Sequence, residues 1–262
     1  MKQLLFSLFA LIALCGCSGV DSDDRFIPVE GITPERTILI EDFTGQNCVN
    51  CPGAHEVLDQ LVAQYPDNII PVSIHAGHFG VAVERTRYPD YVGLMQPEGD
   101  GMASRWGITA FPMGVINRTG EALEVDAWAT AVRDQLAIPS NLDIELTAAL
   151  DGGNISITAI LKPQADIKGT LHVWVIESGI VAFQRDTNTR IPDYVHNNVY
   201  RCSVNGIEGQ GIDLTAHVHE TVTMTQAVRD TETEKWNTAN LDIVAFLETS
   251  SGVLQAAKAH VE

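Results

Sequence analysis

The 262-residue sequence is poor in positive charge. It holds 16 lysine and arginine residues against 34 aspartate and glutamate residues, a formal net charge of −18 at pH 7. Such a chain repels the phosphates of nucleic acids and anionic lipid headgroups, so binding to either is not expected. The charged residues are scattered rather than gathered in blocks, which favours a solvated surface over a specific cationic partner.

Long apolar runs are also scarce. The run from Leu4 to Leu14 follows Met1-Lys2-Gln3 and is too short to span a bilayer as a mature helix, so it predicts an export signal. It ends at Leu14-Cys15-Gly16-Cys17, which resembles the bacterial lipobox. That resemblance implies a signal peptide over residues 1–16 and a lipid on Cys17, with an ordinary cleaved signal as the alternative. In both cases the mature chain reaches a compartment where disulfides persist.

Cysteine is the third scarce residue, because only Cys48, Cys51 and Cys202 lie beyond the signal and the candidate lipid-bearing Cys17. A zinc site normally needs a second CxxC or a Cys/His pair at ligand spacing, so neither a metal nor a cofactor is predicted. A purely structural disulfide between Cys48 and Cys51 stays open, although so short a loop gives little entropic stabilisation. For Cys202 we weigh a small buried apolar role against the resolution of a mixed disulfide.

The Cys48-Val-Asn-Cys51 motif stands at the start of a predicted helix. The apolar residues Ala54, Val57, Leu58, Leu61, Val62 and Tyr65 recur at steps of three and four, the period of one buried helical face. Pro52 then lies in the first turn, where its missing N–H costs nothing. Because unpaired N–H groups at a helix N-terminus stabilise a thiolate, Cys48 is predicted to have the lowered pKa that disulfide exchange requires.

Histidines follow the next predicted strand, Ile69 to Ile74. If this strand is parallel to the strand before Cys48, both end at the same sheet edge, where ligands collect in α/β sheets. His75 is then a candidate for tuning the Cys48 thiolate. A metal pair with His78 and a plain loop histidine are the alternatives. The long stretch from His78 to Ser104 is a candidate for substrate contacts.

The segment from Trp106 to Gly120 is the second informative stretch. Its Phe111-Pro112 dipeptide leads into an apolar strand, and a helix capped by Asp126 is predicted to follow and to end before Pro139. Together with the CxxC motif, this pattern resembles the thioredoxin fold over residues 36–139. The resemblance implies an α/β domain in which Pro112 forms a cis peptide beside the dithiol. The Val-Asn dipeptide differs from the Gly-Pro of thioredoxin itself, so the redox potential does not carry over.

After Pro139 the pattern changes to alternation with a period of two. The segments are 142–146, 155–161, 171–177, 199–204, 212–224, 241–248 and 253–261, with a turn at Asp151-Gly-Gly153. They predict an antiparallel β-sandwich of immunoglobulin-like type over residues 140–262. The cysteine and tryptophan landmarks of a true antibody domain are missing.

The motif from Tyr194 to Cys202, with Phe111-Pro112 and Asn117-Arg118, makes the whole chain resemble the Bacteroidetes outer-membrane lipoproteins of the outer membrane protein twenty-eight family. The resemblance implies a thioredoxin-like domain before a β-sandwich, and a lipid-anchored place in the outer membrane on its periplasmic or cell-surface face. Residues 17–35 form an acidic tether. The acidic run Asp21-Ser-Asp-Asp24 resembles a signal for surface export.

Two functions of different class follow. One is a thiol–disulfide oxidoreductase in which Cys48 attacks, Cys51 resolves and Pro112 backs the substrate, with protein or small-molecule thiols and disulfides as partners. The other is a non-catalytic binding or assembly lipoprotein whose disulfide is structural. The first requires an accessible Cys48, whereas the second predicts an unreactive pair.

Overall fold

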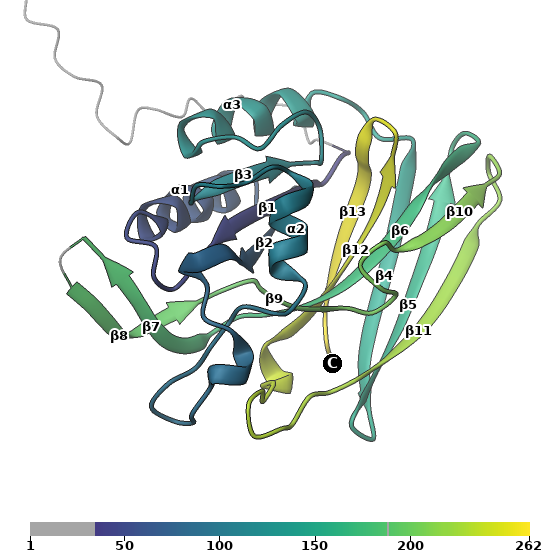
Figure 1. The fold of residues 1–262 in the computed structure, drawn as a ribbon. Helices are drawn as coiled ribbons and strands as arrows, with labels where there is room; N and C mark the ends of the chain where they lie inside the picture. Colours follow the sequence, from purple (N-terminus) through teal and green to yellow (C-terminus); the bar gives the residue numbers. More distant parts are fainter. Residues whose placement is uncertain (1–34, 188) are drawn as a thin grey trace, which may run out of the picture. The chain divides into compact units, whose positions relative to one another are not determined.

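Strands make up most of the structure, and helices are few (Figure 1). The computed structural model describes residues 35–187 and 189–262. The predicted signal peptide, Cys17 and the tether as far as residue 34 lie outside the described residues. No helix within the described ranges is both long and apolar enough to cross a membrane.

The first part of the chain alternates strands and helices. Its elements are β1 (Ile38–Thr44), α1 (Cys51–Gln64), β2 (Ile69–His75), η2 (Gly77–Phe79), η3 (Val83–Arg85), α2 (Gly99–Arg105), β3 (Met113–Ile116) and α3 (Val125–Leu136). As predicted, Pro52 lies in the first turn of α1, and the helix buries Ala54, Leu58 and Leu61. The prediction that Asp126 caps the next helix is wrong. The N-cap of α3 is Glu124, and Asp126 lies inside the first turn, where its charge still favours the helix dipole.

The second part of the chain is made of strands. They are β4 (Leu142–Asp151), β5 (Asn154–Pro163), β6 (Ile167–Glu177), β7 (Ile180–Asp186), β8 (Thr189–His196), β9 (Val199–Ser203), β10 (Gln210–Leu214), β11 (Glu220–Ala227), β12 (Leu241–Thr249) and β13 (Gly252–His260), with η4 (Thr238–Asn240) before β12. Gly152 and Gly153 form the predicted turn between β4 and β5, both with positive φ. The predicted segment 212–224 contains two strands, and β7 and β8 were not predicted.

Strands from both parts share one sheet. Its order is β13-β12-β6-β9-β2-β1-β3, with β10 paired to β6. As predicted, β1 and β2 are parallel and are joined by α1. β3 is antiparallel to β1. The two parts meet where Ser73 of β2 pairs with Val199 of β9. The domain boundary at residue 139 stays a prediction, and strands from before and after this residue belong to the same sheet.

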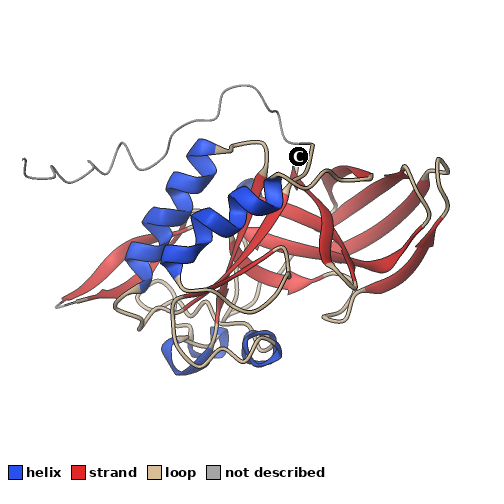
Figure 2. Cartoon of the chain, turned by 90° about the horizontal axis from the view of Figure 1, so that it is seen from above, coloured by secondary structure: helices blue, strands red, loops and turns tan. Residues whose placement is uncertain are grey.

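Two cores lie against this sheet. In one, apolar residues of β6, β12 and β13 pack against the separate sheet β11-β5-β4, with Val173, Val175 and Ile243 fully buried. In the other, Trp174 and Phe246 pack with Leu39 and Phe43 of β1 and with Met102 of α2. Figure 2 shows the helices gathered beside one part of the strands.

The two faces of β1 have different surroundings. Successive side chains of a strand point to opposite faces, so Leu39, Glu41 and Phe43 share one face, and Asp42 and Thr44 share the other. The first face adjoins α2 and the core of Trp174. The second adjoins α1, because Asp42 and Thr44 both approach His55 of that helix. Neighbouring residues of one strand therefore enter two separate sites.

Candidate functional site

The first site is the disulfide between Cys48 and Cys51 at the start of α1. Cys48 is 2% exposed and Cys51 is 0% exposed. Backbone hydrogen bonds hold the loop before them: Cys48 N–H donates to Gly45 O within the loop at 3.0 Å, and Asn47 N–H donates to Phe79 O of η2 at 2.9 Å. The sequence located this pair correctly, but the accessible Cys48 that exchange requires is not found in this closed form.

Pro112 lies beside the same helix start. The Phe111–Pro112 peptide is cis. A hollow of about 450 Å³ is lined by Asn50, Gly53 and Ala54 on one side and by residues 110–113 and 124–126 on the other. The structure therefore brings Pro112 and the CxxC helix together, as the sequence predicts.

A buried carboxyl group lies beneath α1. Asp42 is 0% exposed, and among the described residues no side chain makes a hydrogen bond of normal geometry to either carboxyl oxygen. Burial raises the pKa of Asp42 to about 7, and the nearby Ser73 hydroxyl opposes only part of this shift. A carboxyl group with this pKa can take up and release a proton near neutral pH.

His55 of α1 links this carboxyl group to β8. Its Nε2 lies 3.5 Å from Asp42 Oδ2 and 3.0 Å from Thr44 Oγ1, and its Nδ1 lies 2.8 Å from the Tyr194 hydroxyl. Burial lowers the pKa of His55 to about 4, so the imidazole is neutral at pH 7. Sequence reasoning did not single out Asp42 or His55 because their partners lie on other elements.

His75, the predicted tuning residue, lies in this same layer. It is buried, and neither ring nitrogen has a hydrogen-bond partner in the part of the chain that the structure describes. Its ring centroid is 5.4 Å from that of His196, and the two rings line a small cavity of about 50 Å³ with His55. Burial and the neighbouring His196 lower the pKa of His75. His78 is exposed and stacks on Phe79 instead.

A hairpin from the second part of the chain holds the disulfide loop. Gln184 of β7 is fully buried, and its side-chain amide donates to the Cys48 carbonyl at 2.8 Å and to the Gly45 carbonyl at 3.2 Å. Arg185 N–H donates to Gln46 O at 2.8 Å. Within this hairpin the sequence singled out only the end of β8, where the motif from Tyr194 to Cys202 begins. It gave no sign of Gln184.

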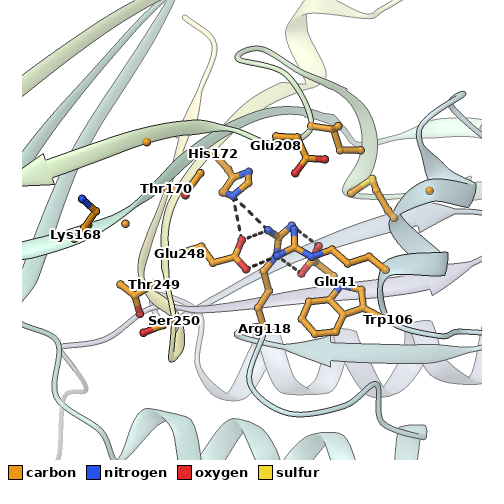
Figure 3. Close-up of a pocket in the computed structure, with 16 residues that line it drawn as sticks. Glu41, Trp106, Arg118, Lys168, Thr170, His172, Glu208, Glu248, Thr249 and Ser250 are labelled. Carbon is orange, nitrogen blue, oxygen red and sulfur yellow. Dashed lines mark hydrogen bonds and ion pairs between the residues drawn. The ribbon is translucent and has the colours of Figure 1, made fainter.

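The second site is a buried charge network on the opposite face of β1 (Figure 3). The Arg118 guanidinium donates to both carboxylate oxygens of Glu41 at 2.9 Å and to Glu248 at 2.5 Å. It also lies over the rings of Trp174 and Phe246. Burial alone would lower the pKa of Arg118, but the two carboxylates raise it, so the cation persists.

Glu248 completes this network. It accepts from Arg105 at 2.6 Å and lies 3.1 Å from His172 Nε2. Burial works to raise its pKa, but the His172 hydrogen bond and the Arg118 charge hold the pKa at about 2. Arg118 and Asn117 both have left-handed backbone conformations, with φ of 53° and 51°. Such strain in residues other than glycine occurs most often at functional sites.

A pocket of about 830 Å³ opens over this network. Its walls include Trp106 and Arg105 beside α2, Thr170 of β6, Glu208, and Ser250 in the turn after β12. The floor charges are compensated within the network, so a ligand would meet hydroxyl groups, the Trp106 indole, the half-exposed Arg105 guanidinium and the exposed charges of Lys168 and Glu208. The sequence singled out Trp106 and Arg118, but it did not predict this pocket.

The remaining cysteine takes no part in either site. Cys202 is unbonded and packs in the core between β6 and the β4-β5-β11 sheet. Burial raises the pKa of its thiol to about 12. Across residues 35–187 and 189–262, no three His, Cys, Asp or Glu side chains are grouped as metal ligands.

These features define a mostly β protein with a buried disulfide at a helix start and a separate charged pocket. The sequence matches the family model of the outer membrane protein Omp28 over residues 100–262. The chain therefore belongs to the Omp28 family of outer membrane proteins. No curated protein matches the sequence.

Solved structures resemble the fold. HBP35 of Porphyromonas gingivalis superposes with a TM-score of 0.62 at 14% identity, covering 87% of this chain and 76% of that one. A protein of Agrobacterium tumefaciens superposes with a TM-score of 0.51 at 13% identity, covering 84% of this chain and 92% of that one. A domain of the outer membrane lipoprotein Omp28 from P. gingivalis gives 0.33 at 19% identity, covering 47% and 89%. At these identities the likeness to HBP35 and to the Agrobacterium protein concerns the fold alone.

Proposed function

We propose that this chain is a lipid-anchored, extracytoplasmic thiol–disulfide oxidoreductase with a thioredoxin-like segment before a β-sandwich. The observation that carries the proposal is the disulfide at the start of α1, a helix whose first turns line a hollow together with the cis Phe111–Pro112 peptide. Cys48 and Cys51 are the reacting residues, Pro112 backs the substrate, and His75 tunes the site. The lipid on Cys17 attaches the protein to the membrane.

The reaction exchanges two electrons and two protons with a substrate protein. In the reduced enzyme, the Cys48 thiolate attacks one sulfur of a substrate disulfide, and the other substrate sulfur leaves as a thiolate and takes a proton. The Cys51 thiol then loses its proton and attacks Cys48. This step restores the Cys48–Cys51 disulfide and releases the second substrate thiol. A substrate dithiol drives the same steps in reverse.

Asp42 is suited to exchange the Cys51 proton. Cys51 and His55 are four residues apart, so they share one face of α1, and His55 on that face approaches Asp42 at 3.5 Å. With its pKa raised to about 7, Asp42 can accept a proton when Cys51 attacks and return it when the disulfide is reduced. A carboxyl group with an ordinary pKa would be a much weaker base.

A second candidate function is supported by other observations. Both cysteines are buried, and the pocket over Arg118, at about 830 Å³, is larger than the hollow of about 450 Å³ beside α1. The pocket residues other than Glu41 fall within the Omp28 family match. In this proposal the chain is a binding or assembly lipoprotein, the pocket takes the ligand, and the disulfide is a structural crosslink.

A redox titration separates the two functions. The protein carrying Cys202→Ser is equilibrated in glutathione buffers, and free thiols are counted by alkylation. A potential between about −270 and −120 mV with rapid alkylation of Cys48 near pH 7 supports the oxidoreductase. A potential below about −300 mV contradicts it and favours the binding protein. Cys48→Ser in the same background identifies which thiol is alkylated.

A further inference from the structure

The hairpin of β7 and β8 pairs with itself and not with the main sheet. Its strands form a separate two-stranded sheet, and β7 contacts α1 (Figure 1). It follows β6, more than 130 residues after the disulfide loop that it touches. Its strands pair with each other independently of those contacts, and Ala182 of β7 packs with Leu94 and Val199.

Hydrogen bonds join this hairpin to residues 45–48 in both directions. Gln184 donates to the carbonyls of Gly45 and Cys48, and the Arg185 N–H donates to the Gln46 carbonyl. In return, the Gln46 side-chain amide donates to the Phe183 carbonyl at 3.2 Å. Each group in these bonds except Arg185 belongs to a buried residue. Residues 45–48 of the loop are therefore bonded to residues 183–185 of the hairpin.

We propose that the β7–β8 hairpin is a latch on the disulfide loop, with Gln184 as its principal positioning residue, and that a thiol reaches the disulfide only when the hairpin releases residues 45–48. This proposal concerns access to the disulfide and does not depend on the proposed oxidoreductase activity. It applies equally to a disulfide that is only structural.

The physical argument begins from the geometry of thiol–disulfide exchange. An attacking thiolate must contact a sulfur atom directly, and access is one of the factors that set the rate. Cys48 and Cys51 are 2% and 0% exposed, so attack requires a local opening. Gln184 fastens the carbonyl of Cys48 itself, so its removal favours that opening more than the loss of an equally buried amide elsewhere.

The other strand of the hairpin has a tie to α1. The Tyr194 hydroxyl lies 2.8 Å from His55 Nδ1, one helical turn beyond Cys51. This contact and the Gln184 contacts come from the two strands of one hairpin, so release of the loop is expected to involve both. Tyr194→Phe deletes only the hydroxyl group and is therefore a mild second way to weaken the latch.

The test measures how fast dithiothreitol reduces the disulfide in the full chain carrying Cys202→Ser. Samples are quenched by alkylation and counted by mass spectrometry. Gln184→Ala is expected to raise the rate about tenfold, the effect of losing one to two buried hydrogen bonds. The matched control is Gln255→Ala. Gln255 is also buried, and its amide donates to the backbone carbonyls of Glu35 and Leu142. Both carbonyls lie outside the disulfide loop, so the rate of disulfide reduction in Gln255→Ala should stay within about twofold of the parent rate.

Equal rates for Gln184→Ala and the parent would overturn the latch, as would an equal gain in Gln255→Ala. The equilibrium constant with dithiothreitol provides a second readout. If the hairpin is a latch, Gln184→Ala speeds reduction and reoxidation of the disulfide equally and leaves the equilibrium constant unchanged. An equilibrium constant that rises by the same factor as the rate of reduction would show instead that Gln184 changes the relative stability of the dithiol and disulfide forms, and would contradict the latch. If Gln184→Ala does not fold, Tyr194→Phe decides the question: a several-fold faster reduction supports the latch, and an unchanged rate rejects it.

Discussion

Glu41 and Asp42 are neighbours on β1, both carboxylic acids and both 0% exposed, yet their surroundings are opposite. Glu41 accepts two hydrogen bonds from Arg118. Asp42 receives no such bond from any described side chain, and burial raises its pKa to about 7. The comparison shows that burial alone does not decide what a carboxyl group does. Glu41 is paired with a buried cation, whereas Asp42 has none and is therefore able to change its protonation state near neutral pH.

The same contrast separates the two sites. The network around Arg118 is closed, since its carboxylates and guanidinium groups satisfy one another. In the layer beneath α1, the protonation state of Asp42 can change with pH, because its neighbours there are neutral histidines and not cations. We therefore expect mutations in the first site to affect mainly stability, and mutations in the second to affect mainly the response to pH.

Removing Arg118 should have the largest effect. Arg118→Leu leaves Glu41 buried without a cation and leaves Glu248 with Arg105 and His172 alone, so the free energy of unfolding should fall by about 3–5 kcal/mol. Urea unfolding at pH 7 measures this change. The control is Arg133→Leu, because Arg133 is 64% exposed and pairs only with its exposed neighbour Asp134. Losses of similar size in the two variants would show that the network contributes no more than a surface pair.

Replacing Asp42 should change how stability depends on pH. The folded carboxyl group keeps its proton up to about pH 7, whereas the unfolded one loses it near pH 4. The folded state therefore binds the extra proton in this window, and the contribution of Asp42 to stability is lost as the pH rises through it.

Asp42→Asn cannot ionise, so its free energy of unfolding relative to the parent should improve by up to about 4 kcal/mol between pH 4 and pH 8. The histidines beneath α1 are present in both proteins, so the difference between the two unfolding curves isolates Asp42. The neighbouring variant Glu41→Gln should be less stable than the parent at pH 8. If the difference in free energy of unfolding between Asp42→Asn and the parent does not change with pH, the raised pKa of Asp42 is wrong.

The smallest effect is expected at the rim of the network. Arg105 is bonded to Glu248 at 2.6 Å, but its side chain is 45% exposed, and solvent screens the pair. Arg105→Ala should therefore lower the free energy of unfolding by no more than about 1 kcal/mol in urea at pH 7. A loss as large as that of Arg118→Leu would mean that the network extends to the surface rather than ending at Glu248.

Several elements could be predicted because their signals are local. The spacing of Ala54, Leu58 and Leu61 predicted α1, and the glycines at 152 and 153 predicted the turn between β4 and β5. The β7–β8 hairpin was missed because its buried residues do not alternate regularly with exposed ones, so it lacks the two-residue period that reveals a strand. The predicted N-cap, Asp126, is two residues too late. Glu124 has the extended backbone of an N-cap, and α3 begins at the next residue.

The sequence by itself determined the CxxC pair, the proline that follows Phe111 and the predominance of strands in the second half, since each is written in residues close together along the chain. Tertiary structure alone decided that Glu41 meets Arg118, 77 residues away, and that Gln184 reaches Cys48 across 136 residues. Such contacts depend on how strands from both halves pair and on which face each side chain takes. A local sequence pattern does not identify a partner on another strand. The raised pKa of Asp42 and the burial of Cys48 could therefore be found only from the fold.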